Sequence, residues 1–351
     1  MFCFKQNITL YIIFKLIYLA RMATKNKEKN TDNYLITHLD QLIKMGKGKE
    51  ARAALEDYFL KNEVPQDAQL AEIASLCLRM GLFDKVTKLL APRIRPTLKI
   101  NLSAPPSPFE ILVYATALIQ SGADLEGQKL LAELDTNKFP RVLFVEALAH
   151  FSRWDYETAV PLLQSYVQHP QLSPYEKQVG RINLCAAIVA IKENIPSYLD
   201  DLINELKAEK KFLLLANALE IKAQSLIKTN DLDRAQNCLD EALYYLKEMG
   251  NRDVLFLNKW KCILKALKEG PTATIHRDFI QIMEEAKKQK HWETVRESDF
   301  YLAKFFDEER YRINKLYFGT PYESYRKKIQ NEFSYSPPEF FDLSLDSSVN
   351  S

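Results

Sequence analysis

Pairs of small or apolar residues twelve positions apart recur along the chain, within stretches whose apolar residues have helical spacing. The pairs are Leu39 and Ala51, Ala74 and Val86, Ala115 and Gly127, Ala147 and Ala159, Ala187 and Leu199, Ala223 and Ala235, and Ile263 and Ile275. Twelve residues suffice to leave one helix, turn, and arrive on the facing side of the next. Because small residues let two antiparallel helices touch closely, the recurrence predicts a stack of helix hairpins.

A turn is predicted five residues before the second member of each pair. The turn positions are Gly46, Gly81, Gly122, Trp154, Asn194, Asn230 and Gly270. Glycine and asparagine tolerate the left-handed backbone conformation found at helix ends. Successive turns lie 32 to 41 residues apart, which is near the length of two three-turn helices with their loops. A large apolar residue follows each pair one helical turn later, namely Leu55, Leu90, Leu131, Leu163, Ile203, Leu239 and Phe279.

Two segments show this pattern most completely. Residues 216–250 contain Leu219, Ala223, Leu226, the turn Asn230-Asp231-Leu232-Asp233-Arg234-Ala235, Leu239, Ala242 and Leu243, and residues 147–166 follow with the turn at Trp154. Over residues 33–306 the chain resembles the tetratricopeptide-repeat (TPR) family. That resemblance implies an all-α fold, a right-handed α-solenoid of about seven TPR-like helix hairpins with a C-terminal capping helical segment.

The pattern divides the chain into six segments. Five prolines between residues 92 and 108 predict a linker, because proline inside a helix removes a hydrogen bond. The expected segments are a leader and polar stretch (1–32), N-terminal hairpins (33–91), the proline-rich linker (92–108), the main array (109–306), capping helices (307–332) and a disordered tail (333–351).

Residues 1–21 differ from the rest of the chain. Residues 8–20 are apolar, but Lys15 interrupts them near the middle, which is costly for a membrane span. Met22 and the polar run after it read as an ordinary cytosolic start, so we interpret residues 1–21 as an over-extended gene start or a non-structural leader. Alternatives are a membrane anchor or uncleaved signal, and a helix packed on the array. The expected location is cytoplasmic, with anchoring in an inner membrane through this stretch as the alternative.

Composition and charge agree with a folded helical protein. Hydrophobic residues make up 47% and charged residues 27%, with only 9 glycines. A net charge of +2 argues against a nucleic-acid coating or an acidic tail. The five cysteines are scattered without paired short spacings, which predicts free buried thiols and favours a reducing compartment.

No reactive constellation stands out in the sequence. None of the five histidines lies at metal-ligand spacing, and neither a nucleophile elbow nor a dinucleotide fingerprint is present. The run Gly46-Lys47-Gly48-Lys49 lacks the first half of a phosphate loop and reads as a helix turn. We therefore expect a non-enzyme without catalytic residues, cofactor or metal.

In the TPR family the first helix of each hairpin lines a concave groove. Carried onto this chain, that geometry places several polar side chains on one surface of the third to sixth hairpins. The candidate partner-binding residues are Arg141, Arg181, Lys192, Asn217, Gln224 and Lys228. The basic ones could hold a carboxylate or an acidic peptide. The expected function is a non-catalytic scaffold or adaptor that binds a peptide or helix of a partner protein in this groove.

Two other functions fit the sequence. One is the sensor part of a transcription-related regulator, because the C-terminal segment mixes aromatic with basic residues and could contact nucleic acid. Its basic residues are Arg310, Arg312, Lys315, Arg326, Lys327 and Lys328. The other is a membrane-tethered assembly factor, which requires residues 1–21 to be a real anchor.

Overall fold

The computed structural model describes residues 30–44, 48–61, 68–95, 105–191, 197–248, 254–288, 291–306 and 311–337. These residues form helices and no strand, which confirms the all-helical prediction. Residues 1–29, which include most of the predicted leader, lie outside the described residues. Helix α2 starts at Asn30, before residue 33, where the sequence predicts the first hairpin to begin. The first helices are α2 (Asn30–Lys44), α3 (Gly48–Lys61), α4 (Ala68–Arg79), α5 (Phe83–Ile94), α6 (Pro108–Gln120), α7 (Asp124–Leu131), α8 (Arg141–Ser152) and α9 (Tyr156–Gln168).

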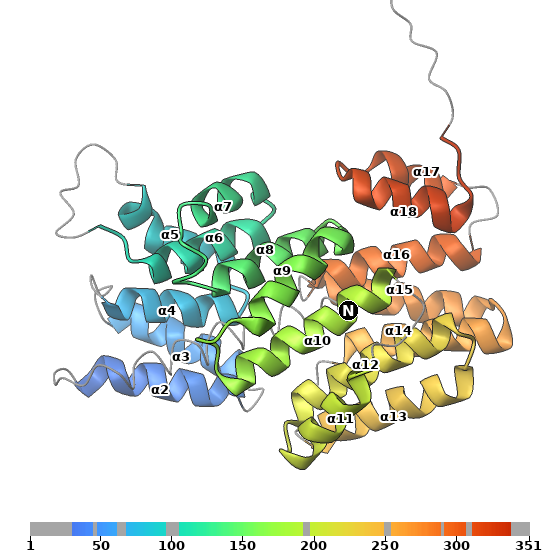
Figure 1. The fold of residues 1–351 in the computed structure, drawn as a ribbon, viewed down its shortest axis with the longest axis horizontal. Coiled ribbons are helices and arrows are strands. Elements are labelled where there is room, and N and C mark those ends of the chain that lie inside the picture. Colours follow the sequence, from blue (N-terminus) through green and yellow to red (C-terminus); the bar gives the residue numbers. More distant parts are fainter. Residues whose placement is uncertain are drawn as a thin grey trace, which may run out of the picture.

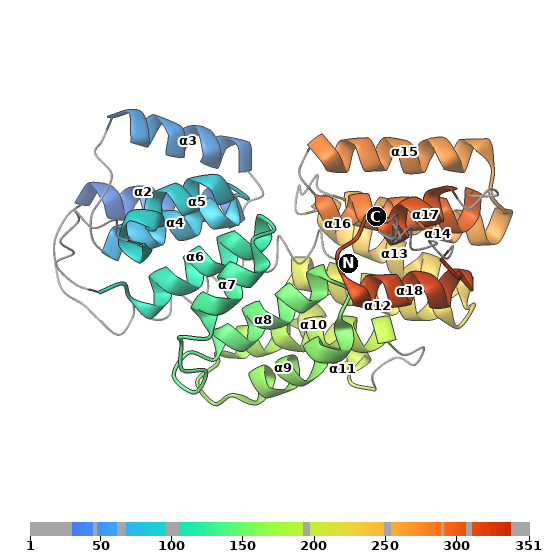
Figure 2. The same cartoon turned by 90° about the horizontal axis from the view of Figure 1, so that it is seen from above.

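From α4 to α18 each helix packs against the next one, and α2 packs against both α3 and α4 (Figure 1). Seen from above, α2–α7 form one arm, α8–α11 the base and α12–α18 the other arm of a curved arrangement (Figure 2). The remaining helices are α10 (Pro174–Ile191), α11 (Leu199–Ala208), α12 (Phe212–Lys228), α13 (Leu232–Glu248), α14 (Leu255–Glu269), α15 (Ala273–Lys288), α16 (Trp292–Phe306), α17 (Tyr311–Phe318) and α18 (Glu323–Phe333).

The residue pairs twelve positions apart are buried at every one of the seven predicted places. The helices α6 and α7 approach closely, since a Cβ added to Gly127 would lie 2.8 Å from the carbonyl oxygen of Ala115. Only a residue without a side chain permits this approach. The small residues therefore set the distance between the paired helices, as the sequence pattern predicts.

The predicted turns have a positive φ wherever the structure describes them. The φ angles are +70° at Gly81, +91° at Gly122, +60° at Trp154, +60° at Asn230 and +82° at Gly270. Gly46 and Asn194 lie outside the described residues. A buried tryptophan in this conformation is unusual, since its Cβ makes a positive φ costly, and tertiary contacts must hold it there.

The proline-rich linker is shorter than predicted, because α5 continues through Pro92 to Ile94. Proline lacks the N–H that would bond to the carbonyl of Lys88, and so close to the end at Ile94 this loss affects only the last turn of the helix. Pro108 begins α6, with Ser107 and Glu110 forming a capping box. Residues 96–104 lie outside the described residues.

Packing is continuous from α5 to α6, on either side of this linker. Arg93 of α5 donates hydrogen bonds to both carboxylate oxygens of Glu110. Burial would raise the pKa of Glu110, but hydrogen bonds from Arg93 and Ser107 hold it below its usual value. The change of core occurs instead at α8, where Val142, Val145 and Ala149 belong to one apolar cluster and the opposite face to a second.

The folded region extends beyond the predicted start of the disordered tail. Phe333 ends α18, and Tyr335 is 5% exposed. The Tyr335 ring packs against Tyr317 of α17, and its hydroxyl donates to the Asn314 side chain. Tail composition alone could not show this, because the contact depends on α17 lying beside the chain. Residues 338–351 lie outside the described residues.

Four cysteines of the described part of the chain are free thiols, and three of them are buried. Burial raises the pKa of Cys77 and of Cys185 to about 12, so both stay protonated at neutral pH. Within the described ranges, none of the helices combines the length and the apolar character needed to cross a bilayer.

Candidate interaction surface

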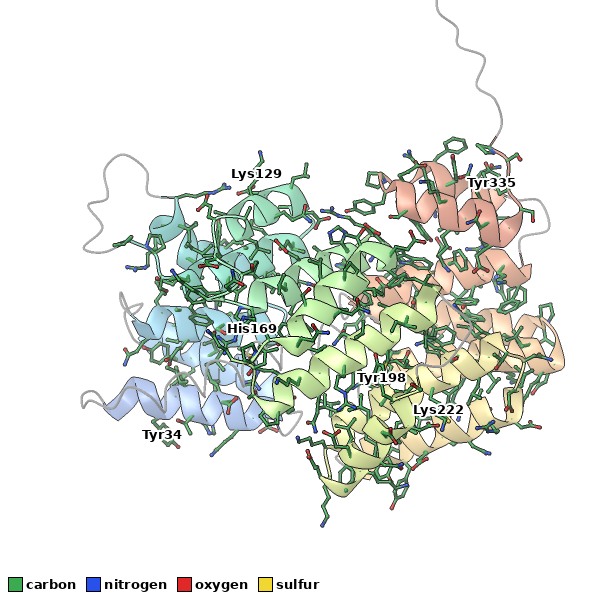
Figure 3. All side chains as sticks on the ribbon, in the orientation of Figure 1. Tyr34, Lys129, His169, Tyr198, Lys222 and Tyr335 are labelled. Atoms are coloured by element: carbon green, nitrogen blue, oxygen red, sulfur yellow. The ribbon has the colours of Figure 1, made fainter. Side chains whose placement is uncertain are left out.

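Two of the predicted basic groove residues face carboxylates of the same chain. The Arg141 guanidinium lies 3.3 Å from the buried carboxylate of Glu176. Arg181 donates a 2.9 Å hydrogen bond to Glu205 of α11, and its guanidinium stacks over the ring of Tyr198, which is labelled in Figure 3. Their positive charges are therefore largely neutralised within the fold.

The two predicted amide side chains are buried on α12. Asn217 donates a 2.6 Å hydrogen bond to the backbone carbonyl of Leu213, one turn earlier. Gln224 donates a 2.6 Å hydrogen bond to the side chain of Glu220. Neither faces open solvent, because α12 packs against α10, α11, α13 and α14. Lys192 lies outside the described residues.

Lys228 contacts the end of a neighbouring helix. Its ammonium donates hydrogen bonds of 2.6 Å and 3.1 Å to the backbone carbonyls of Val189 and Ala190, in the last turn of α10. These carbonyls lack partners within their own helix, and a cation there also meets the negative end of the helix dipole. Lys228 thus stabilises the junction between α10 and α12.

Replacing Lys228 by Met is expected to lower the free energy of unfolding by about 0.5–2 kcal/mol, since the α10 carbonyls lose a charged donor. Urea unfolding followed by circular dichroism would measure the change. The exposed Lys247 of α13 offers a matched control, and Lys247→Met should leave the unfolding midpoint nearly unchanged. Equal shifts for the two variants would contradict the assignment.

The basic C-terminal segment also uses its charges internally. Arg312 pairs with Asp299 at 3.0 Å, and Arg326 donates to the carbonyl of Thr320 at 2.7 Å. The Lys328 ammonium lies over the rings of Trp154 and Phe300. Burial lowers the pKa of Lys328, and Glu332 partly offsets this effect. Arg310 lies outside the described residues, while Lys315 and Lys327 are exposed.

A groove that the sequence analysis missed runs along α14, between α13 and α15. Its volume is about 530 Å³, and its floor includes Leu255 and Cys262 of α14 with Ile282 of α15. Burial raises the pKa of Cys262 to about 11, so this thiol is uncharged at neutral pH. The α14 residues that line the groove extend from Leu255 to Glu269, the first and last residues of the helix.

Charged side chains line both edges of this groove. On the α13 side, Lys261 pairs with Asp240 at 2.7 Å and Lys268 pairs with Asp233 at 2.6 Å. Half-buried Lys265 lies between them and has no ion-pair partner among the described residues. On the α15 side, Asp278 contributes a half-buried carboxylate. An apolar floor between charged edges suits an amphipathic segment.

One sequence signal for this groove was available. Asn258, Lys261, Lys265 and Lys268 follow the three-and-four spacing of a single helix face. Such a face reads equally well as ordinary solvated surface. Only the positions of α13 and α15 on either side turn it into the floor of a groove.

No family model matches this chain. A search of curated proteins also finds no match. Among the described residues, no group of three or more histidine, cysteine, aspartate or glutamate side chains is arranged to hold a metal ion.

Proposed function

We propose that this protein is a non-catalytic scaffold that binds a helical segment of another protein in the groove between α13, α14 and α15. The open groove along α14 is the observation that carries the proposal. It combines a floor of Leu255, Cys262 and Ile282 with charged edges of both signs. Recognition of an amphipathic helix uses this combination, since apolar anchors supply affinity and flanking charges fix orientation.

The groove replaces the inner face of the third to sixth hairpins as the proposed binding site. On that inner face, Arg181 and Lys228 already have partners within the chain. A ligand would have to break these contacts before gaining its own, which lowers the net affinity. Lys265 requires no such exchange of ion-pair partners, because none of the described carboxylates pairs with it.

Within this proposal the hairpins are TPR-like and form a right-handed superhelix of about seven units. The buried residue pairs and the left-handed turns at the predicted positions support this class. Consecutive packing of the helices agrees with it. A scaffold role follows naturally from such an array, because stacked hairpins form extended surfaces for partner segments.

Filling the groove tests the proposal. Asn258 is half-buried on the groove floor, and Asn258→Trp should occupy space that a partner helix needs. Lys129→Trp on the outer face of α7 is the matched control, since Lys129 points away from the array (Figure 3). Immobilised wild-type and variant proteins would be compared by quantitative mass spectrometry of what each captures from a lysate.

The expected result is a defined set of proteins that wild type and Lys129→Trp retain and Asn258→Trp loses. Circular dichroism spectra of the three proteins should coincide, so that loss of binding is not loss of fold. Identical capture by Asn258→Trp and wild type would reject the groove as the binding site.

A further inference from the structure

The C-terminal helices contact turns that lie far away in the sequence. Arg296 of α16 donates a 2.6 Å hydrogen bond to the carbonyl of Ser152, 144 residues earlier. The Ser324 hydroxyl donates a 2.6 Å hydrogen bond to the carbonyl of Arg153, 171 residues earlier. These contacts join α16 and α18 to the turn between α8 and α9, and both hydrogen bonds are partly buried.

A second set of contacts reaches the turn between α6 and α7. The Tyr322 hydroxyl donates a 3.0 Å hydrogen bond to Asp124, 198 residues earlier. Arg153 donates to the same carboxylate at 3.3 Å, and its guanidinium lies over the Tyr322 ring. Burial and the charge of Asp124 raise the pKa of Tyr322, so its hydroxyl keeps its proton at neutral pH. Asp124 therefore connects both turns to the C-terminal end.

An aromatic cluster completes this junction. The Trp154 ring lies 5.3 Å from the Phe300 ring of α16 and 4.6 Å from the Tyr325 ring of α18, measured between centroids. Trp154 belongs to the α8–α9 turn, and its left-handed backbone points the ring toward the C-terminal helices. Apolar contact and directed hydrogen bonds thus occur at the same place.

In an open solenoid each repeat contacts only its neighbours, so that distant repeats unfold independently. We infer that α16 and α18 form a clasp on the α6–α7 and α8–α9 turns. The clasp couples the middle of the array to its C-terminal end, so these two regions open together. This device also constrains the curvature of the array, because the C-terminal arm is tied to the base at the α8–α9 turn and to the other arm at Asp124 of α7. The inference does not depend on what the groove binds.

Hydrogen exchange of the full chain tests the coupling. The double variant Tyr322→Phe with Ser324→Ala removes two donors that reach the distant turns and leaves the aromatic cluster intact. Each hydrogen bond contributes enough to change an opening equilibrium several-fold, so backbone amides of α6–α9 should exchange on the order of tenfold faster. Lys327→Ala, an exposed position on α18, is the control and should leave exchange in α6–α9 unchanged.

Faster exchange in α6–α9, which ends 154 residues before Tyr322 in sequence, would support the clasp. Faster exchange confined to α17 and α18 would overturn it, since the middle hairpins would then be stable without these contacts. Unchanged exchange in both regions would overturn it as well. Arg296→Lys provides a second variant, because lysine keeps the charge but cannot reproduce both guanidinium contacts, with Ser152 and with Glu293.

Discussion

Trp154→Ala is expected to lower the free energy of unfolding by about 3–5 kcal/mol, the usual cost of truncating a large buried aromatic residue. The Trp154 side chain is 7% exposed and contacts two helices from the C-terminal end. Its removal leaves a cavity between Phe300 and Tyr325 and takes away the surface on which Lys328 rests. Because whole proteins are stable by only about 5–15 kcal/mol, this single change should shift the urea midpoint clearly.

The chain offers a matched control for this prediction. Trp292, at the start of α16, is 51% exposed, and Trp292→Ala should change stability little. Trp154→Gly separates the two causes of the effect, since glycine relieves the left-handed strain and should be less harmful than alanine by up to about 1 kcal/mol. Similar destabilisation by Trp154→Ala and Trp292→Ala would show that the junction contributes little to stability.

Gly127→Leu is expected to destabilise the protein by about 1–3 kcal/mol or more, because α6 and α7 have no room for a side chain between them. Even a Cβ atom at this position would lie 2.6 Å from the Ile119 side chain and 2.8 Å from the Ala115 carbonyl oxygen. The side chain could rotate away, but the backbone oxygen can move only if the two helices separate. The lost packing would extend to Leu131, which is fully buried nearby on α7.

Lys129→Leu is the control for this substitution, two residues further along α7. Lys129 is exposed, so the same leucine there should change the melting temperature very little. Differential scanning calorimetry of both variants would measure the difference. Comparable melting temperatures for Gly127→Leu and Lys129→Leu would contradict the close helix contact and the alignment of the hairpins that it supports.

Much of the array could be predicted from residue spacing alone. Small residues such as Ala223 and Ala235 lie a fixed number of residues before and after a turn in the sequence. Both are fully buried in the structure. The residue at the turn, Asn230, has the positive φ that its position predicts. These features depend on contacts within one hairpin. The residues that make such contacts are close in sequence, so their spacing reveals them.

The binding surface was harder to predict from sequence. The resemblance to TPR hairpins predicts Arg181 on an inner face, but a pattern cannot show that Glu205 lies 2.9 Å away on the next helix. For the groove along α14 the sequence does not show that a charged side chain has no ion-pair partner among the described residues. The sequence around Lys265 is that of an ordinary solvated helix face, and only the positions of α13 and α15 make it part of a groove. Whether a charge is free depends on neighbours from other helices, and spacing along one helix does not report them.

By itself, the sequence determined that the chain is helical, where its hairpins turn, and which small residues lie between paired helices. These properties are local, because they follow from helix periodicity and backbone conformation. Tertiary structure alone decided that Pro92 remains helical, that Tyr335 is buried, and that Tyr322 meets Asp124 across 198 residues. Each depends on how distant hairpins are placed relative to one another. That placement results from many small rotations of each hairpin relative to the next. No single segment of the sequence encodes that placement.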